Sequence, residues 1–522
     1  MRRARQPFGP AARIAVALGA CVAFAAGIAQ AKESPAPAPA DANGYATTAR
    51  ATTSAYSGCF TAPTVSYVLP ADAALSDQAN MNCFAWQQFI ALNWQASATQ
   101  NGQPDTSVTA RSFGTPSATA PTVWETYALS SNVFRPNAAT PLPFNGASRK
   151  AAARAKPGRA PFVRGAAAED ALVDIYQAFT DLKGWITAQN GMPTYYEKRM
   201  NVEEYDYIVN NRLYDANAQW QRIASNTGIQ LPDGSASGTV GAIEIKAAWL
   251  PLTDPSLYAR YLTRPATLID PATRKRTNAV VGLVGLHIIH KTRKAQQFAW
   301  ATFEQVDNVP VQGQVGAGPY TYYNPHCDPS SDPYQCRVNT IPLCTGNACD
   351  YTQPTQVTRV QPILADVAEL NAYVQDVIRS ANPQSVMQYY QLISVMWPSA
   401  STTLTGAGLT PLTAGSPQPP NGVGGLANAV LETFFQNLNS MSPNSLLTQP
   451  NCLACHTVAT LPNRGVPPDW GTKPKNYASD YSFLFSEAEA RAATSLVAAP
   501  CKPAAAARAN HPKDRGCSRR KP

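Results

Sequence analysis

The stretch NAVVGLVGLHIIHKT, residues 278–292, decides the fold that the sequence predicts. It is a strand-length apolar run, rich in valine and isoleucine, and it ends at a basic turn. Two runs of the same kind, GAIEIKAAWLPL (241–252) and QQFAWATFEQVDNV (296–309), precede and follow it. Turns containing proline, glycine or basic residues separate the three runs, which is typical of strands in one largely antiparallel sheet.

Helical patterns surround this predicted sheet. CFAWQQFIALNWQA (83–96) carries apolar residues at roughly helical spacing and is expected to form a buried amphipathic helix. Further helices are expected at 167–189, 202–225, 360–381, 385–397, 426–441 and 486–499. The expected fold class is α+β, mostly helical, with a central and largely antiparallel sheet and a helical C-terminal region.

Composition divides the chain into five segments. They are a signal peptide (1–31), a leader with an N-terminal helix and loops (32–165), an α+β core (166–310), a Cys-rich loop (311–358) and the helical C-terminal region (359–522).

The N-terminus has the three parts of a secretory signal peptide. A basic region with four arginines precedes an apolar run (14–28) and the small-residue motif Ala29-Gln30-Ala31. Such a signal would direct the chain to the periplasm or beyond and would be cleaved near Ala31. No other apolar stretch is long enough to cross a bilayer, so the mature chain is expected to lack a transmembrane segment.

A second interpretation of the N-terminus is a lipoprotein signal. Leu18-Gly19-Ala20-Cys21 resembles a lipoprotein box, in which Cys21 would be lipidated. Cleavage near Ala31 is favoured because apolar residues continue beyond Cys21.

Charge narrows the choice of partner. The formal net charge of +9 falls to +5 when residues 1–31 are removed, because that segment holds four arginines and no acid. An exported, mildly basic protein is expected to bind an acidic protein partner and no nucleic acid.

The cysteines agree with export. Eight of them lie outside both the signal peptide and the motif described next, and an even number in an oxidising compartment predicts disulfides. Local pairing would join Cys59 to Cys83, Cys501 to Cys517, and form two bridges among Cys327, Cys336, Cys344 and Cys349.

The motif that carries chemistry lies in NCLACHTVAT, residues 451–460. Cys452, Cys455 and His456 form a Cys-x-x-Cys-His pattern, which is the attachment signature of one covalent haem c. The two thiols add to the vinyl groups of the porphyrin, and the adjacent histidine supplies an axial nitrogen to iron. Chance would give this pattern in about 0.2% of shuffled chains of this composition.

Two other uses of such a pattern fit less well. A redox-active Cys-x-x-Cys would need a thioredoxin-like βαβ setting, which this region lacks. A zinc site would need a second pair of ligands nearby, whereas the next histidine is His511.

These three residues and the helices expected around them resemble bacterial c-type cytochromes. Upstream, VGLVGLHIIHKT and FAWATFEQVDN resemble large secreted bacterial proteins of the cytochrome c family. The resemblance implies a haem cofactor and does not specify a substrate.

The chain departs from the pattern of small cytochromes at the sixth iron ligand. Those proteins use a methionine after the motif, and this chain has none after His456. The candidates are Met441, His287 and His290, with His511 or another donor such as Lys475 as alternatives. Met387 and Met396 are expected to be core residues of a helix.

His287 and His290 should point to opposite faces of one strand, because they are three residues apart. His287 is expected to share a face with Val281, Leu283 and Ile289 and to enter an apolar core. The favoured interpretation of such a histidine is a neutral core residue bonded to one backbone carbonyl, with a sixth ligand or a distal-pocket residue as alternatives.

Other candidate residues have mainly structural interpretations. Glu304 and Asp307 are acids in an apolar strand, expected to be buried and paired, with a proton-donor role near haem as the alternative. His326 and His511 are expected at the surface. The tryptophans Trp86, Trp94, Trp124, Trp249, Trp300 and Trp397 are expected in the core.

Three functions are compatible with these observations. The favoured one is an exported monohaem cytochrome that transfers electrons to a redox partner protein, with iron held by six ligands. The second is a haem-dependent oxidoreductase, peroxidase- or oxygenase-like, whose upstream residues wall an open iron position. The third is a haem-based sensor or binding module.

Overall fold

A computed structural model describes residues 59–60, 64–73, 75–116, 120–145, 171–178, 183–236, 238–316, 318–331, 334–344, 348–398, 420–421, 427–437, 451–457, 459–466 and 477–491. The predicted signal peptide lies outside the described residues. So do Cys21, Met441, Lys475, Cys501, His511 and Cys517.

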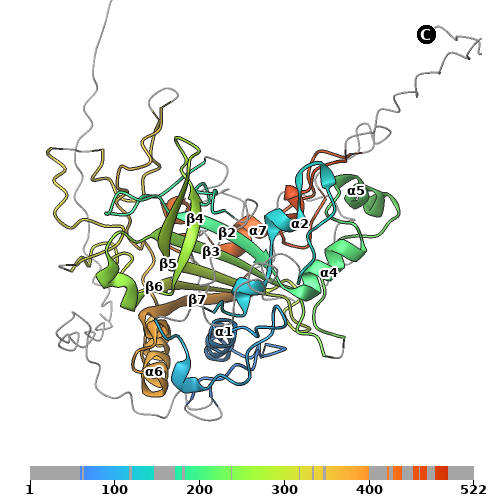
Figure 1. The fold of residues 1–522 in the computed structure, drawn as a ribbon, viewed down its shortest axis with the longest axis horizontal. Coiled ribbons are helices and arrows are strands. Elements are labelled where there is room, and N and C mark those ends of the chain that lie inside the picture. The colour runs from blue at the N-terminus through green and yellow to red at the C-terminus, as the bar shows by residue number, and fades with distance from the viewer. Residues whose placement is uncertain are drawn as a thin grey trace, which may run out of the picture. The chain divides into compact units, whose positions relative to one another are not determined.

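One antiparallel sheet organises these residues (Figure 1). Its strand order is β1-β2-β3-β5-β6-β7-β8, and β4 also pairs with β5. The strands are β1 (Ala128–Leu129), β2 (Tyr195–Met200), β3 (Ile243–Pro251), β4 (Thr263–Ile269), β5 (Arg276–His290), β6 (Ala299–Gln305), β7 (Tyr390–Pro398) and β8 (Pro420–Asn421). β5 has 15 residues and is long enough to pair with β3, β4 and β6.

The α-helices are α1 (Gln78–Leu92), α2 (Ser130–Val133), α4 (Val202–Asn210), α5 (Ala216–Ala224), α6 (Ala365–Ala381) and α7 (Cys452–His456). Short 3-10 helices occur at η1 (Ala110–Ser112), η2 (Trp124–Thr126), η3 (Pro136–Ala138), η6 (Pro255–Arg260), η7 (Val386–Tyr389), η8 (Thr433–Asn437) and η10 (Leu484–Glu487). The α+β class and the mostly antiparallel sheet are therefore confirmed.

The two faces of the sheet are covered differently. Helices α1 and α6 lie side by side against one face, where Phe89 stacks on Phe303 and Trp86 donates to Asn371 (Figure 1). The other face carries two smaller apolar clusters, one containing Trp300 and Leu453 and the other containing Val284 and Val430. This second face is called the motif face below, because α7 packs on it.

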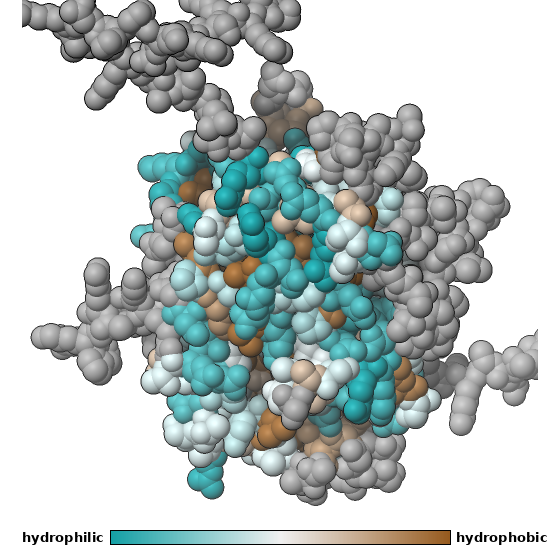
Figure 2. All heavy atoms as spheres, turned by 90° about the vertical axis from the view of Figure 1, so that its right-hand side faces the viewer, coloured by the Kyte–Doolittle hydropathy of each residue, from teal (hydrophilic) through white to brown (hydrophobic). Residues whose placement is uncertain are grey.

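The segments near residue 430 and near residue 455 therefore both pack on the motif face, against strands that come earlier in the chain. Figure 2 shows a part of the surface that is mostly hydrophilic, with apolar residues in small separate patches.

A one-residue irregularity in β5 controls which side chains reach the motif face. Ala248 pairs with Gly285 while the next residue, Trp249, pairs with Leu283, so Val284 is an extra residue in β5. Such a bulge inverts the alternation of faces beyond it. The expectation that His287 shares a face with Val281 and Leu283 is therefore wrong, because those two residues pack in the cluster against α1.

Several predicted helices are replaced by other structure. Residues 385–397 form η7 followed by strand β7, because a short apolar run buried on both faces resembles a buried helix in sequence. Between 167 and 189, the described residues make isolated bridges instead of a helix.

The predicted helix 202–225 is two helices, α4 and α5, separated by the capping residues Asn211 and Asp215. The described parts of 426–441 and 486–499 contain only η8 and the last residues of η10. Helices 83–96 and 360–381 are confirmed, with α1 beginning earlier at Gln78 and α6 beginning later at Ala365.

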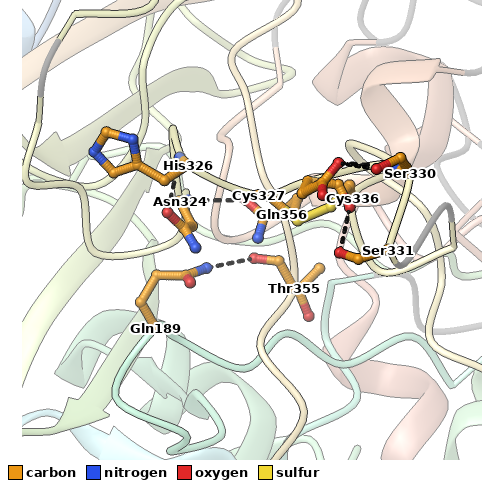
Figure 3. Close-up of a disulfide and its surroundings, with 10 residues drawn as sticks. Gln189, Asn324, His326, Cys327, Ser330, Ser331, Cys336, Thr355 and Gln356 are labelled. Atoms are coloured by element: carbon orange, nitrogen blue, oxygen red, sulfur yellow. Dashed lines mark hydrogen bonds between the residues drawn. A yellow bond between two sulfur atoms is a disulfide. The ribbon is translucent and has the colours of Figure 1, made fainter.

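The local disulfides are confirmed where the structure describes them. Cys59 joins Cys83, and the Cys-rich segment holds Cys327–Cys336 and Cys344–Cys349. Beside the second of these, Gln356 accepts from the Asn324 amide and Gln189 donates to Thr355 (Figure 3). His326, in the same loop, is exposed as expected.

Glu304 is buried and paired, as the sequence predicts. Its carboxylate accepts two bonds from Arg359, of 3.2 and 2.6 Å, and a third of 2.7 Å from the amide of Ala429. It therefore anchors residues 427–437 to the sheet. Asp307 pairs with Arg260 in a half-buried position. The six tryptophans named above are all buried.

We expect Glu304→Gln to lower the free energy of unfolding by about 3–5 kcal/mol, because it leaves the Arg359 charge buried without a counter-charge. Asp376→Asn is the control, since Asp376 forms an exposed pair with Arg379 and should cost less than about 1 kcal/mol. Urea unfolding at pH 7 measures both. Equal losses in the two variants would contradict this account of the anchor.

Candidate haem site

The Cys-x-x-Cys-His motif forms the one-turn helix α7, Cys452–His456. Leu453 is fully buried in the apolar cluster that includes Trp300, Ile289 and Met396. Burial of the Leu453 side chain therefore holds α7 against the sheet through the hydrophobic effect. Cys452, Cys455 and His456 remain half-buried around it.

The ring of His456 is held in one orientation and one tautomer. Its Nδ1 lies 2.7 Å from the backbone carbonyl oxygen of Tyr481. A carbonyl can only accept, so Nδ1 carries the proton and Nε2 has a free lone pair. The ring also contacts Trp300 and Phe483, at centroid distances of 4.3 and 5.0 Å.

Burial keeps this imidazole neutral. Desolvation lowers the pKa of His456 to about 4, although the bond to Tyr481 acts in the opposite direction. A neutral imidazole with Nδ1–H bonded to a carbonyl is the form in which metal-binding histidines present Nε2. Among the described residues, Nε2 of His456 makes no hydrogen bond.

Burial also favours the uncharged form of the Cys452 thiol. Burial raises its pKa well above the usual value, and the charge of Glu432 adds to the effect. Reactive and zinc-binding cysteines need a readily formed thiolate, so this environment suits neither use. Within the described part of the chain, no group of three or more His, Cys, Asp or Glu side chains could hold a metal ion.

Two rows of side chains cross the motif face beside α7. In the first row, Glu244, Ile289, Trp300 and Met396 are successive cross-strand neighbours. In the second row, Lys198, Lys246, His287, Thr302 and Ser394 are successive neighbours on β2, β3, β5, β6 and β7. Residues two apart on a strand share a face, so both rows face the motif side.

The carboxylate of Glu432 contacts two residues of the second row, His287 and Lys246. It lies 2.5 Å from Nε2 of His287 and 3.6 Å from Nζ of Lys246. Burial alone would raise the pKa of Glu432, but the charges of His287 and Lys246 lower it to about 2. Lys246 also donates to the carbonyls of Gln177 and Leu431, both at 3.3 Å. Burial lowers its pKa despite Glu432.

The structure places the two histidine candidates for the sixth iron ligand on opposite faces of the sheet. His287 lies on the motif face and influences the pKa of His456 through its charge. His290 lies on the opposite face, where it bonds Gln88 and the carbonyl of Val240 and stacks on Phe84 of α1. His290 therefore has the buried, carbonyl-bonded environment that the sequence predicts for His287, whereas His287 contacts the carboxylate of Glu432. Burial lowers the pKa of His290 to about 4.

Met387 and Met396, which the sequence predicts to be core residues, are both fully buried, but on opposite faces of the sheet. Met387 is buried in the cluster against α1, whereas Met396 lies next to Trp300 on the motif face. Met387 belongs to η7 and Met396 to β7, so neither lies in the predicted helix. Met441 lies outside the described residues.

Sequence reasoning missed Lys246, Glu244 and Glu432. The first two had a visible signal, because they alternate with isoleucine in IEIKAAWLP and a two-residue period places them on one face. Glu432 had none, since residues 427–437 were expected to be helical and their position over β5 is a tertiary contact.

No family model matches the chain, and no curated protein or solved structure was found to be significantly similar to it. None of the helices in the described ranges is long and apolar enough to span a membrane.

We expect Glu432→Gln to lower the free energy of unfolding at pH 7 by at most about 3 kcal/mol, given the pKa shift. A depressed carboxyl pKa contributes stability above about pH 4.5 and loses it as pH falls toward 2. The difference from the parent protein should therefore shrink on acidification. Glu369→Gln, on the exposed side of α6, is the control. Urea unfolding at several pH values measures the effect, and a pH-independent loss would contradict it.

Proposed function

We propose that the chain binds one haem c through thioether bonds to Cys452 and Cys455, with His456 as the proximal iron ligand. The observation that carries this proposal is the bond from His456 to the Tyr481 carbonyl. It orients the ring and leaves Nε2 unprotonated, as an iron ligand requires.

We further propose that the protein is an exported electron-transfer cytochrome that acts with a redox partner protein. When bound, the haem supplies one-electron chemistry. The chain's own residues orient His456 through the Tyr481 carbonyl and cover part of its ring with Trp300 and Phe483. Met396 and His287 are the described side chains on the motif face that offer a sixth ligand. The Glu432 bond already engages Nε2 of His287, which favours Met396.

A haem-dependent oxidoreductase is the second candidate, and one observation favours it. Lys246, His287 and Glu432 form a linked set of ionisable groups on the motif face, and their side chains are 18%, 11% and 27% exposed. Such a set could bind or protonate a small substrate beside an open iron position.

Optical and EPR spectra of the purified protein distinguish the two candidates. Electron transfer predicts low-spin ferric iron and no binding of carbon monoxide to the ferrous form. High-spin iron that binds carbon monoxide would favour the enzyme. Met396→Leu and His287→Gln should be compared, because loss of the low-spin signal in only one of them identifies the sixth ligand.

We expect His456→Ala to lower the haem content per chain at least about tenfold, because losing even an outer partner of a metal ligand costs that much. His326→Ala is the matched control, since His326 is exposed in the disulfide loop, and should leave the haem content unchanged. Haem content is measured as a pyridine haemochrome after expression with export and cytochrome c maturation. Equal haem content in both variants would exclude His456 as the ligand.

A further inference from the structure

Two glutamates that the proposed haem site does not use are buried together on the motif face. Glu204 lies in the first turn of α4 and is fully buried, and Glu244 of β3 is 7% exposed. Their carboxyl groups are in hydrogen-bond contact with each other. Both oxygens of Glu204 and one oxygen of Glu244 receive no bond from any donor in the described part of the chain.

The position of Glu204 is unusual for its place in a helix. It is the third residue after the capping Asn201, where a glutamate commonly folds back onto the backbone N–H of the capping residue. Here that N–H donates instead to the carbonyl of Ile243. The Glu204 carboxyl is therefore released from capping and turned toward Glu244.

The charges around the pair do not neutralise it. Lys291 is the nearest buried cation, and its Nζ lies 2.5 Å from Asp480, whose carboxylate also accepts from the amide of Leu231. On the other side, Lys198 pairs with Glu487. Asp233, in the loop before β3, adds a further negative charge that acts on Asp480. Each nearby cation is thus already matched by another acid.

Two buried carboxylates in contact cannot both stay ionised without a counter-charge. A proton held between them satisfies the oxygens that otherwise lack a donor. Burial raises the pKa of both groups, and the charge of Glu244 raises the pKa of Glu204 further. At Glu244, hydrogen bonds with Ser482 and Glu204 partly oppose the rise in pKa, while the charges of Asp480 and Glu487 add to it.

The pair is connected to the proposed haem ligand by two routes. Ser482, which bonds Glu244, is adjacent to Tyr481, whose carbonyl holds His456. Glu244 is also the cross-strand neighbour of Ile289, which pairs with Trp300 against the His456 ring. Glu244 on β3 and Trp300 on β6 are therefore two strand spacings apart, which is about 10 Å. A unit charge at that distance in a protein interior changes a proton affinity by about tenfold.

We propose that Glu204 and Glu244 form a proton-binding site coupled to the redox state of the proposed haem. With haem bound, uptake of one electron from the partner protein would be accompanied by uptake of one proton from solvent by Glu204 and Glu244. Return of the electron to a partner would be accompanied by release of that proton to solvent. The half-buried pair Lys198–Glu487 is partly exposed to solvent and interacts electrostatically with Glu244, so it offers a route for that proton. This proposal rests on the proposed function and makes the electron transfer dependent on pH.

The test is the midpoint potential of the haem-loaded protein as a function of pH, with Glu244→Gln, Glu204→Gln and the exposed control Glu369→Gln. We expect the parent and the control to show a potential that falls as pH rises through the neutral range. We expect both dyad variants to lose most of that dependence. A pH-independent potential in the parent protein would overturn the proposal, and so would an unchanged dependence in the two variants.

An infrared difference spectrum, reduced minus oxidised, provides a second measurement on the parent protein and does not depend on the variants folding. It should show a protonated carboxyl gained on reduction. A protein without bound haem would refute the proposed function, whereas a haem protein without this band would refute only the proton coupling.

Stability gives a third measurement that needs no haem. The pKa of Glu244 is raised to about 7, and a raised carboxyl pKa contributes stability that is present below the unfolded value and lost as pH rises through the folded value. The parent protein should therefore lose stability to urea between about pH 5 and 8 relative to Glu244→Gln. Parallel curves for the two proteins would contradict the shared proton.

Discussion

The pairing of β5 with β3 and β6 is the constraint on which the rest of the structure depends. This pairing brings together residues 243–251, 276–290 and 299–305, and so defines the two faces of the sheet. The extra residue Val284 then determines that His287 reaches the motif face while His290 reaches α1. Without that single-residue bulge, the polar and apolar rows would exchange faces.

Burial is the common cause of the site's chemistry. The same desolvation keeps His456 neutral, keeps the Cys452 thiol protonated and disfavours ionisation of Glu244. Glu432 stays ionised because two cationic partners outweigh its burial. The motif face therefore holds three kinds of group. The motif residues Cys452 and His456 are uncharged, and the carboxylate of Glu432 is balanced by cationic partners. The acids Glu204 and Glu244 have no cation of their own among the described residues. That combination is suited to holding a cofactor whose charge changes by one.

Part of this arrangement could be predicted from sequence and part could not. Runs 278–292 and 360–381 form the strand and the helix that the sequence predicts, but the bulge at Val284 left no signal in the first of them. Run 385–397 was predicted wrongly because strand and helix share the same pattern when both faces are buried. Cys452, Cys455 and His456 were visible as a local motif. Tyr481, Trp300 and Glu432 were not, because they reach the motif through tertiary contacts from distant segments.

Covalent capture of haem at α7 is the central claim, and the mass of the mature protein tests it most directly. Protein exported with cytochrome c maturation should be heavier than the polypeptide by one haem, and the addition should survive denaturation. Peptide mapping should place it on the fragment that contains Cys452 and Cys455. A mature mass equal to that of the polypeptide alone, or haem released on denaturation, would contradict the account.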